Sequence, residues 1–453
     1  MKNQNLLIGI LFLFIWTPSS DAHLDPSEPN WHKVEKELVP LLQKLIQTDS
    51  QNPPGNELAV CRVLQEFLNH EGVRNQIFRV SPGRANLLAR LHGNGSKKAI
   101  LLVAHTDVVP FDSAEWSVPP LSGAIKDGYL YGRGALDDKG MLAVEAMTLV
   151  LLKRQNIPLN RDIIFLAAAG EETGGGIGIG RMLEKDRTLA DAAFAYNEGG
   201  RIVLQGERPL YIGIQISEKV AYNIHLTARG TTGHSSVPRT DNAIFALARA
   251  LHRLESHPAM ITLNPVTRAF FTGIAPLDPR ITFQGESIET KNPLYLSMTT
   301  NTISPTLIEG GFKTNVHPAS ATVNLNCRLQ PDQDLGDFLD SLRSWVSPGA
   351  YLFEYSAKSP APPASSPEGV GFILLEQVCQ EMFPDAPVLP YQSPGMSDGT
   401  RLRKAGVSTY GLLPFPLSED EIWRIHSKDE RISIESLMTG MQLMYRVSVL
   451  GGK

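Results

Sequence analysis

Histidine and carboxylate side chains gather in five short motifs of this sequence, and both side-chain types are common ligands of divalent metal ions. The motifs are His105-Thr106-Asp107, the glycine-rich turn 132–140 with Asp137 and Asp138, 170–176 with Glu171 and Glu172, 197–200 with Glu198, and 425–430 with His426. Three of them directly follow apolar runs that are predicted to be strands. An α/β sheet builds its active site beyond the carboxyl ends of its strands, so we expect these side chains to converge there.

Each motif alone also has a structural explanation. A lone His-x-Asp pair is at least as often structural as ligating, and an Asp before a helix is a favoured N-cap. The glycine-rich turn matches neither GxGxxG nor GxxxxGK[ST], which disfavours phosphate binding. Glu171 and Glu172 could lie in a solvated loop, although adjacent carboxylates after a buried strand repel each other unless a cation offsets them.

Taken together, the motifs supply two histidines and three or four carboxylates. Such a set suits a pair of divalent cations, because zinc accepts both donor types and two ions can share a bridging carboxylate and a bridging water. A remaining glutamate could then take the proton of that water. The motifs therefore predict metal-assisted hydrolysis.

Composition excludes several other classes of protein. The chain has 453 residues, a formal net charge of −5 and no long basic run, which argues against nucleic-acid binding. Its cysteines are Cys61, Cys327 and Cys379, too few for a disulfide scaffold or a cysteine-based zinc module. Cys61 lies on the apolar face of a predicted helix, where a buried thiol is expected.

The first segment predicts export. Residues 1–22 contain one lysine, an apolar run from Leu6 to Trp16, and Ser20-Asp21-Ala22 before the predicted cleavage point. This pattern is typical of a secretory signal peptide. The alternative, a membrane anchor, is disfavoured because the apolar run is well short of the roughly 20 residues needed to span a bilayer. A soluble mature chain beginning near His23 is expected.

The rest of the chain predicts an α/β catalytic domain with a mostly parallel sheet flanked by helices. Apolar strands at Ile100–Ala104, Ile163–Ala169 and Ala192–Tyr196 alternate with helices such as Lys139–Arg154. The pattern of apolar residues changes after about Ile214, where alternating strands and amphipathic helices predict an inserted α+β unit. We assign 23–215 and 359–453 to the catalytic domain and 216–358 to the insert, with the Pro- and Ser-rich 359–367 as connector.

These motifs resemble, in their order and spacing, the zinc exopeptidase and amidohydrolase family of carboxypeptidase S, aminoacylase and succinyl-diaminopimelate desuccinylase. The resemblance rests on Ala104–Pro110, GRGALDDKG, GEETGG and NEGG, and it extends from about Trp31 to Val449. The stretch Trp116–Tyr131 is more similar to the carboxypeptidase S branch. The family implies an inserted lid, or dimerisation, domain.

The resemblance implies a pair of zinc ions, or other divalent cations such as Co²⁺ or Mn²⁺. His105 and Glu198 would bind one ion, and Glu172 and His426 the other. Asp137 would bridge the two ions. Asp138 would then cap the helix or lie outside the ligand set.

The resemblance also implies catalytic roles. Glu171 would be the general base and later the proton donor, while Asp107 would orient His105. His234, in the lid motif Gly233–Ser236, would reach the site of a partner subunit and stabilise the oxyanion there. A homodimer through the lid follows from that role, although the long stretch 257–309 could enlarge the lid and replace a partner.

Substrate contacts are implied for Asn315 and for Arg328, whose guanidinium would hold a substrate carboxylate. His317 takes a position that is usually apolar in this motif, so we interpret it as structural. Relatives carry a Thr/Ser-Asp-Ser/Ala-Arg run where this chain has Ser397–Arg401, which displaces or replaces the arginine.

The sequence thus predicts an exported, zinc-dependent hydrolase of amide bonds next to a free carboxylate. Its substrate would be a short peptide trimmed from the C-terminus or an N-acyl amino acid, and no sequence feature separates the two. A succinyl-diamino-acid hydrolase is one alternative. An exported peptide- or metal-binding protein on an inactive hydrolase scaffold is the other, and it would predict loss of a ligand or of the base.

Overall fold

The computed structural model describes residues 28–258, 260–356 and 361–453. The predicted signal segment, residues 1–22, lies outside the described residues. No helix in the described part of the chain is long and apolar enough to cross a membrane.

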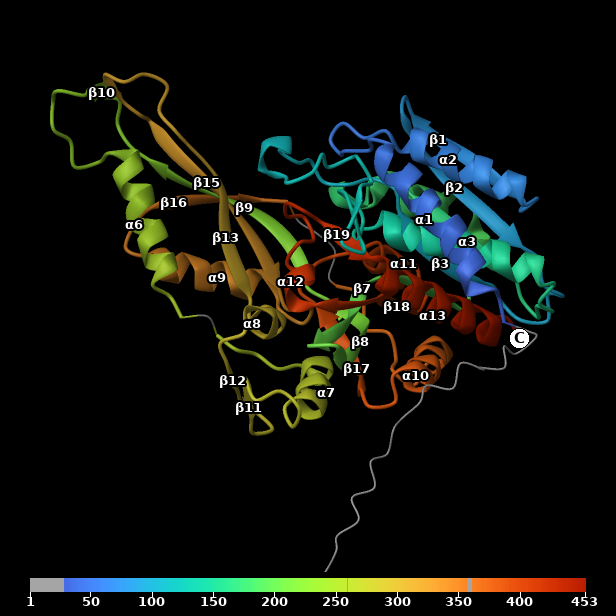
Figure 1. Ribbon diagram of the computed structural model, residues 1–453. Helices are drawn as coiled ribbons and strands as arrows, with labels where there is room; N and C mark the ends of the chain where they lie inside the picture. Colours follow the sequence, from blue (N-terminus) through green and yellow to red (C-terminus); the bar gives the residue numbers. More distant parts are fainter. Residues whose placement is uncertain (1–27, 259, 357–360) are drawn as a thin grey trace, which may run out of the picture.

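An eight-stranded sheet forms the centre of the molecule, with the strand order β1-β2-β6-β3-β7-β18-β8-β17 (Figure 1). Its strands β3, β6 and β7 run parallel, as do β7 with β18 and β8 with β17, whereas β1 and β2 are antiparallel. The strands are β1 (Asn75–Ser81), β2 (Arg84–Leu91), β3 (Ile100–His105), β6 (Ile163–Ala168), β7 (Phe194–Gln205), β8 (Arg208–Glu218), β17 (Val388–Ser393) and β18 (Thr409–Ser418).

Both faces of this sheet are buried, which explains why its strands are continuous apolar runs. In β3, Ile100, Leu102 and Ala104 join one core cluster, and the alternate residues Leu101 and Val103 join another on the opposite face. Helices cover the first face: α1 (Trp31–Gln47), α2 (Glu57–His70), α3 (Lys139–Arg154), α10 (Val370–Met382) and α13 (Ile434–Gly452). Shorter helices cover the second: α4 (Arg181–Lys185), α5 (Arg187–Ala190) and α11 (Gly399–Lys404). The predicted mostly parallel sheet flanked by helices is confirmed, and α3 has the predicted bounds.

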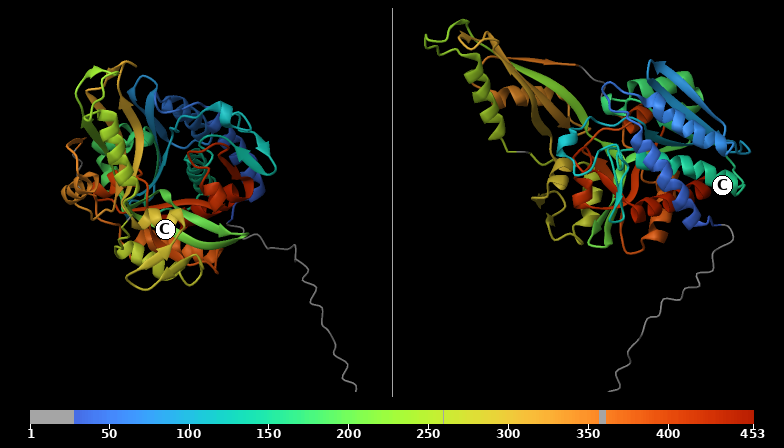
Figure 2. Two further views of the ribbon diagram at one scale, coloured as in Figure 1. Left: turned by 90° about the vertical axis from the view of Figure 1, so that its left-hand side faces the viewer. Right: turned by 45° about the horizontal axis from the view of Figure 1, so that its top comes forward.

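A second lobe, the lid, projects from the central domain (Figure 2). It has a hydrophobic core of its own. Its antiparallel sheet has the order β13-β15-β9-β16, and two amphipathic helices pack against it. The elements are β9 (Val220–Arg229), α6 (Ala243–Glu255), β13 (Thr302–Gly310), β15 (Ser320–Leu329), α9 (Leu335–Val346) and β16 (Tyr351–Tyr355). The chain enters the lid directly from β8, so an α+β unit interrupts the central domain as expected.

The middle of the predicted insert packs elsewhere. The elements α7 (Pro265–Ile274), β11 (Ile281–Phe283), β12 (Ile288–Thr290) and α8 (Pro293–Thr299) lie against the central sheet rather than the lid core. The ring of Phe270 has its centre 5.1 Å from that of Tyr211 and 5.7 Å from that of Tyr391. A stretch predicted to enlarge the lid therefore contributes to the core of the central domain.

The remaining elements are short and lie in the connecting segments. They are η1 (Ser113–Glu115), β4 (Ile125–Lys126), β5 (Tyr129–Tyr131), η2 (Glu171–Thr173), η3 (Gly176–Gly180), β10 (Gly233–His234), β14 (Val316–His317), α12 (Glu419–Ile422) and β19 (Arg431–Ser433). Several of them carry the predicted motifs, so the site is built mainly from loops held by the sheet.

Candidate metal centre and substrate cavity

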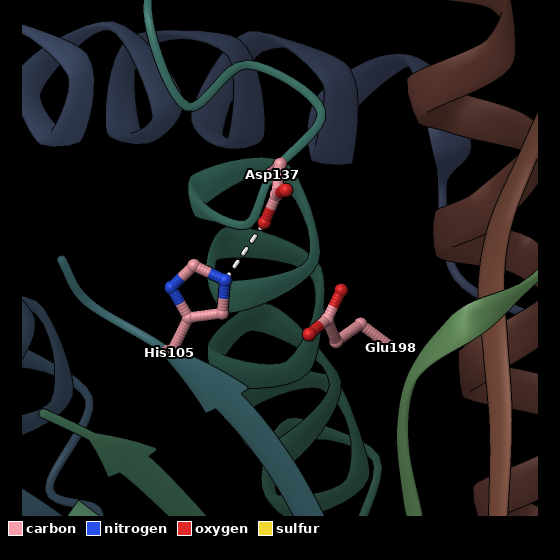
Figure 3. A group of neighbouring side chains, drawn as sticks. All are labelled: His105, Asp137 and Glu198. Atoms are coloured by element: carbon pink, nitrogen blue, oxygen red, sulfur yellow. Dashed lines mark hydrogen bonds and ion pairs between the residues drawn. The ribbon is translucent and has the colours of Figure 1, made fainter. Parts of the chain in front are cut away.

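His105, Asp137 and Glu198 point toward one another from three different elements (Figure 3). His105 is the last residue of β3, Asp137 lies two residues before α3, and Glu198 lies within β7. Nε2 of His105 lies 2.7 Å from Oδ1 of Asp137, and this histidine is 2% exposed. Ligand atoms of the three residues all lie within 4.8 Å of one another, so one cation can contact all of them.

A second group of ligands shares Asp137. Nε2 of His426 lies 3.0 Å from Oδ2 of Asp137 and 3.2 Å from Oε1 of Glu172. These three residues also offer ligand atoms within 4.8 Å of one another. His426 follows α12 in a loop and has an unusual positive φ of 61°. Because Asp137 turns one oxygen toward each histidine, its carboxylate is placed to bridge two cations.

The Asp107 carboxylate ties the end of β3 to the loop that carries Glu171 and Glu172. Oδ1 of Asp107 accepts hydrogen bonds from the backbone N–H groups of Gly170 at 2.9 Å and Glu171 at 3.2 Å, and Oδ2 accepts from that of Glu172 at 3.3 Å. Nδ1 of His105 lies 2.9 Å from the backbone carbonyl of Asp107 but 3.7 Å from its carboxylate. The carboxylate therefore holds the glutamate loop, and the carbonyl gives the imidazole its closer contact.

Glu198 faces the site because two glycines follow it in β7. Gly199 has a φ of 117°, and a Cβ there would lie 2.1 Å from Oε1 of Gln215. A Cβ at Gly200 would lie 2.2 Å from the carbonyl oxygen of Gly411. A side chain at Gly200 would clash with the backbone of the neighbouring strands, and one at Gly199 would need a strained positive φ. The register of β18 on β7 shifts just beyond Gly411.

A buried ion pair holds the turn that carries Asp137. Nη1 of Arg133 lies 2.6 Å from Oε2 of Glu430, and both residues are almost fully buried. Oε1 of Glu430 accepts hydrogen bonds from the backbone N–H groups of Leu136 at 2.8 Å and Asp137 at 3.1 Å. Sequence reasoning missed this pair, whose members lie 297 residues apart. The signal in the sequence was that both charges fall inside motifs expected to converge on one site.

Replacing Glu430 by alanine should destabilise the protein and weaken metal binding. It leaves the Arg133 guanidinium buried without its partner, and breaking a buried ion pair costs about 3–5 kcal/mol. We expect a lower midpoint of guanidinium-induced unfolding and a higher Kd for metal, because the turn carrying Asp137 loses its support. Glu66→Ala, which removes an exposed partner of Lys44, is the control and should change neither quantity. Wild-type behaviour of Glu430→Ala would contradict this role.

The ligand cluster concentrates negative charge. Burial and the neighbouring Glu198 raise the pKa of Glu171 well above its ordinary value, and burial and Asp137 raise the pKa of Glu198 to about 8. Although burial lowers it, contacts with Asp137 and Glu172 raise the pKa of His426 to about 10. Divalent cations would relieve this repulsion, and imidazole and carboxylate are a donor set that zinc accepts. The residues present therefore fit a pair of metal ions.

Metal affinity should rise with pH. Without metal at pH 7, His426, with a pKa of about 10, and Glu198, with a pKa of about 8, hold protons that a cation must displace. Raising the pH makes these protons easier to displace, so we expect tighter binding from about pH 6 to about pH 9. Titration calorimetry in buffers of different ionisation enthalpy measures both the affinity and the protons released. An affinity that does not change with pH would contradict this charge arrangement.

The two ligand groups open into a cavity of about 1030 Å³ that residues of both lobes line. The lid contributes Ala221, Asn223, Asn326 and Arg328. Nε of Arg328 donates to Oδ1 of Asn326 at 3.1 Å. Burial lowers the pKa of Arg328, whereas the nearby Glu171 raises it. Among the described residues no carboxylate forms an ion pair with Arg328, so its charge remains available to a ligand.

Glu218, the last residue of β8, organises the C-terminal loop of this cavity. Its Oε2 accepts hydrogen bonds from the backbone N–H of Ser397 at 2.9 Å and from the Ser397 hydroxyl at 3.0 Å. Its Oε1 accepts from the Thr400 hydroxyl and the Arg403 guanidinium. This buried network was not expected from the sequence, because its members are separated by about 180 residues.

The arginine of the altered Ser397–Arg401 run braces a neighbouring loop. Nε of Arg401 donates to the carbonyl oxygen of Gly174 at 2.8 Å, next to the glutamate loop. Asp398 is buried, and neither of its carboxylate oxygens has a hydrogen-bond partner in the part of the chain that the structure describes. Burial raises the pKa of Asp398 to about 7. The run thus adds another acid close to the ligand cluster.

His234 and Asn315 lie outside this cavity. His234 is exposed in β10, which pairs with β14 at the end of the lid far from β3 and α3 (Figure 1). The backbone N–H of Ser235 donates to the carbonyl of Asn315 at 3.1 Å, so the two predicted residues are neighbours. Nε2 of His317 lies 3.0 Å from the carbonyl of Val237, within the lid. Of the three residues predicted around the substrate, only Arg328 lines the cavity of its own chain.

Comparison with known families identifies this arrangement. The model of peptidase family M20/M25/M40 matches residues 101–449. The chain belongs to this family. The match includes every predicted ligand, from His105 to His426, together with Arg328 and His234.

Relatives of this M20 peptidase include several kinds of hydrolase. The chain is 30% identical over 410 residues to the human N-fatty-acyl-amino acid synthase/hydrolase PM20D1. The aligned region covers 85% of this chain and 79% of the relative. The chain is 28% identical to the probable carboxypeptidase S-like 2 of Dictyostelium discoideum over 78% of this chain and 71% of that one. A probable succinyl-diaminopimelate desuccinylase of Staphylococcus aureus is 31% identical over 68% of this chain and 72% of that protein.

Solved structures share the fold. The M20 metallo-carboxypeptidase Sso-CP2 of Sulfolobus solfataricus has a TM-score of 0.70 at 20% identity and covers 91% of this chain and 99% of its own. Human carnosine dipeptidase 1 also has a TM-score of 0.70, at 18% identity, over 92% of this chain and 96% of its own. The family match makes the M20 chain a metal-dependent hydrolase, and the solved structures show that it has the two-lobed fold of its family, as the sequence predicted.

Proposed function

We propose that the protein is an exported zinc hydrolase that cleaves an amide bond next to a free carboxylate. Its substrate would be an N-acyl amino acid or a short peptide. The observation that carries the proposal is the pair of ligand groups sharing Asp137, with Glu171 and Arg328 lining the same cavity. The family relatives include an N-acyl-amino acid hydrolase and a probable carboxypeptidase, which supports both substrate classes.

The bound cations would supply a water of lowered pKa and would polarise the carbonyl group that it attacks. His105, Glu198, Asp137, Glu172 and His426 would hold them. Side chains of the cavity would carry out the other steps, the first of which is binding of the substrate. The Arg328 guanidinium would bind the free carboxylate of the substrate, because its terminal nitrogens can donate two parallel hydrogen bonds.

We infer that Glu171 moves the proton. It lies next to the ligand Glu172, lines the cavity, and belongs to neither ligand group. We assign it the proton of the attacking water, which it then delivers to the leaving amine. Asp107 would keep it in place through the backbone of residues 170–172.

Glu171→Gln should retain both metal ions and lose turnover. The amide keeps the shape of the side chain but cannot accept the proton, so we expect kcat to fall by roughly 10²- to 10⁴-fold. Release of free amino acid from N-acyl amino acids and N-blocked dipeptides would be measured, before and after chelation and zinc readdition, with metal content measured in parallel. Full activity of the variant would refute the base assignment. A wild type that binds metal but cleaves none of these substrates would favour the succinyl-diamino-acid hydrolase or the binding protein instead.

The lid offers a surface for a second copy of the chain. Large apolar side chains on α6, β13 and the loop after β13 are exposed: Phe245 by 64%, Leu307 by 68%, Ile308 by 66% and Phe312 by 84%. β13 is also an edge strand of the lid sheet, and its backbone is open to pairing. We propose a dimer through this face, in which His234 of each chain completes the site of the other.

Mixing two inactive variants tests this sharing. Glu171→Gln lacks the base and His234→Ala lacks the lid histidine, so each homodimer should be slow. A mixed dimer would combine the intact base of one chain with the intact His234 of the other, and activity should return. Refolding the variants together, with ultracentrifugation to establish the dimer, measures the effect. If mixed dimers form but activity does not return, His234 does not act on a partner's site.

Export is the part of the proposal that rests on residues 1–22 alone. Expression of the full chain in a secreting host, followed by N-terminal sequencing of the product, should give a chain starting near His23. An intact N-terminus retained inside the cell would contradict it.

A further inference from the structure

Arg201 is a second arginine of the substrate cavity that the proposed mechanism does not use. It lies in β7, three residues after the metal-ligand candidate Glu198, and is half-buried. In the register of the sheet, Arg201 is opposite Leu413 of β18, and both residues line the cavity. Neighbouring residues in register point to the same face of a sheet, so the Arg201 side chain shares the cavity face with Leu413.

An aromatic ring from a neighbouring strand packs against this guanidinium. Cζ of Arg201 lies 5.3 Å from the centre of the Tyr391 ring, and Tyr391 itself is 1% exposed. Opposite Arg201 on β8 is Gly213, where a Cβ would lie 3.1 Å from the Tyr391 ring. The glycine thus leaves room for the ring beside the arginine. Stacking on an aromatic face restrains a guanidinium and leaves its N–H edges free to donate.

The acids of this region are engaged elsewhere. Asp278 and Glu419 both pair with Arg280, at 2.8 Å and 2.7 Å. Glu218 pairs with Arg403. Among residues 28–258, 260–356 and 361–453, the Arg201 side chain makes no ion pair with a carboxylate and no hydrogen bond; its contact is with the Tyr391 ring. A guanidinium that is half-buried in a cavity without an acid partner is a site for an anionic group.

Arg201 and Arg328 belong to different walls. Arg328 lies on β15 of the lid and interacts electrostatically with Glu171. Arg201 lies in the central sheet and interacts with Tyr391 and Tyr211. On the Arg201 wall the cavity is lined with Leu413 of β18, Leu417 and Ile422, which suit methylene groups.

We infer that Arg201 binds a second anionic group of the substrate, on the acyl side of the amide bond. This inference rests on the proposed function, because it assumes that the amino-acid carboxylate is held by Arg328. The preferred substrate is then an amino acid whose acyl group is a short dicarboxylic acid. Its methylene groups contact the leucine and isoleucine side chains, and its terminal carboxylate pairs with Arg201.

The test compares acyl groups that differ only in the terminal charge. A panel of N-acetyl amino acids is first assayed with the zinc-loaded full chain, which tests the proposed function, and the amino acid released fastest is kept. Its N-glutaryl derivative is then compared with the uncharged terminal amide of the same length and with the N-hexanoyl derivative. The enzymes are the wild type, Arg201→Gln and Arg201→Lys, with Arg328→Gln as the matched control from the other wall.

Wild type should cleave the glutaryl substrate with a kcat/KM roughly 10- to 100-fold above that of its amide, the contribution of one hydrogen bond between charged groups. Arg201→Gln should abolish this preference mainly through KM and leave the uncharged substrates unchanged. Arg201→Lys should keep part of the preference. Arg328→Gln should slow all of the substrates to a similar extent.

Some outcomes would contradict the role of Arg201 and leave the proposed function intact. Equal cleavage of glutaryl and amide substrates by the wild type would do so, as would a clear preference for hexanoyl. A loss that Arg201→Gln imposes equally on charged and uncharged substrates would show a structural role only. If the zinc-loaded wild type cleaves no member of the panel or of the acyl series, and no N-blocked dipeptide either, the proposed function itself fails.

Discussion

The repulsion among clustered carboxylates is the constraint on which the rest of the structure depends. Asp137, Glu171, Glu172 and Glu198 come from three separate segments and meet near the carboxyl ends of β3 and β6, where Glu198 faces them from within β7. Two further acids hold the loops that carry these residues. Asp107 binds the backbone N–H groups of residues 170–172, and Glu430 binds those of residues 136 and 137. Hydrogen bonds from backbone amides to a buried carboxylate are charge-assisted, so these loops stay fixed although their own acids repel one another.

Much of this arrangement could be predicted because it is local in the sequence. Both faces of β3 and β6 are buried, so these strands are continuous apolar runs in the sequence. The helix α3 begins directly after the acidic pair Asp137-Asp138. Parallel strands end at one edge, so residues that follow them must gather there. The structure does bring His105, Asp137, Glu172, Glu198 and His426 together as two groups with one shared residue. Their roles in catalysis stay predictions, as does the export signal.

The supporting contacts could not be predicted because they join distant segments. Arg133 and Glu430, or Glu218 and Arg403, carry no periodicity or spacing that relates one to the other. The prediction that the stretch 265–299 belongs to the lid failed for a similar reason. This stretch is flanked by lid elements in the sequence, but the aromatic side chains Phe270, Phe271 and Tyr295 pack in the central core. Composition alone does not say which of two cores an apolar segment joins.

Charge placement also explains how a chain with a net charge of −5 can bind an anionic substrate. The acids of the cavity are concentrated at one point, where bound cations would offset them. Arg201 and Arg328 lie in different walls of the cavity, the central sheet and the lid, without acid partners among the described residues, so cations bound by the ligand groups would make the cavity locally positive. A cleft focuses such a field regardless of the net charge of the protein. A substrate with a carboxylate at each end would align in this field with its amide bond at the cations, and the alignment itself would place the scissile carbonyl beside Glu171.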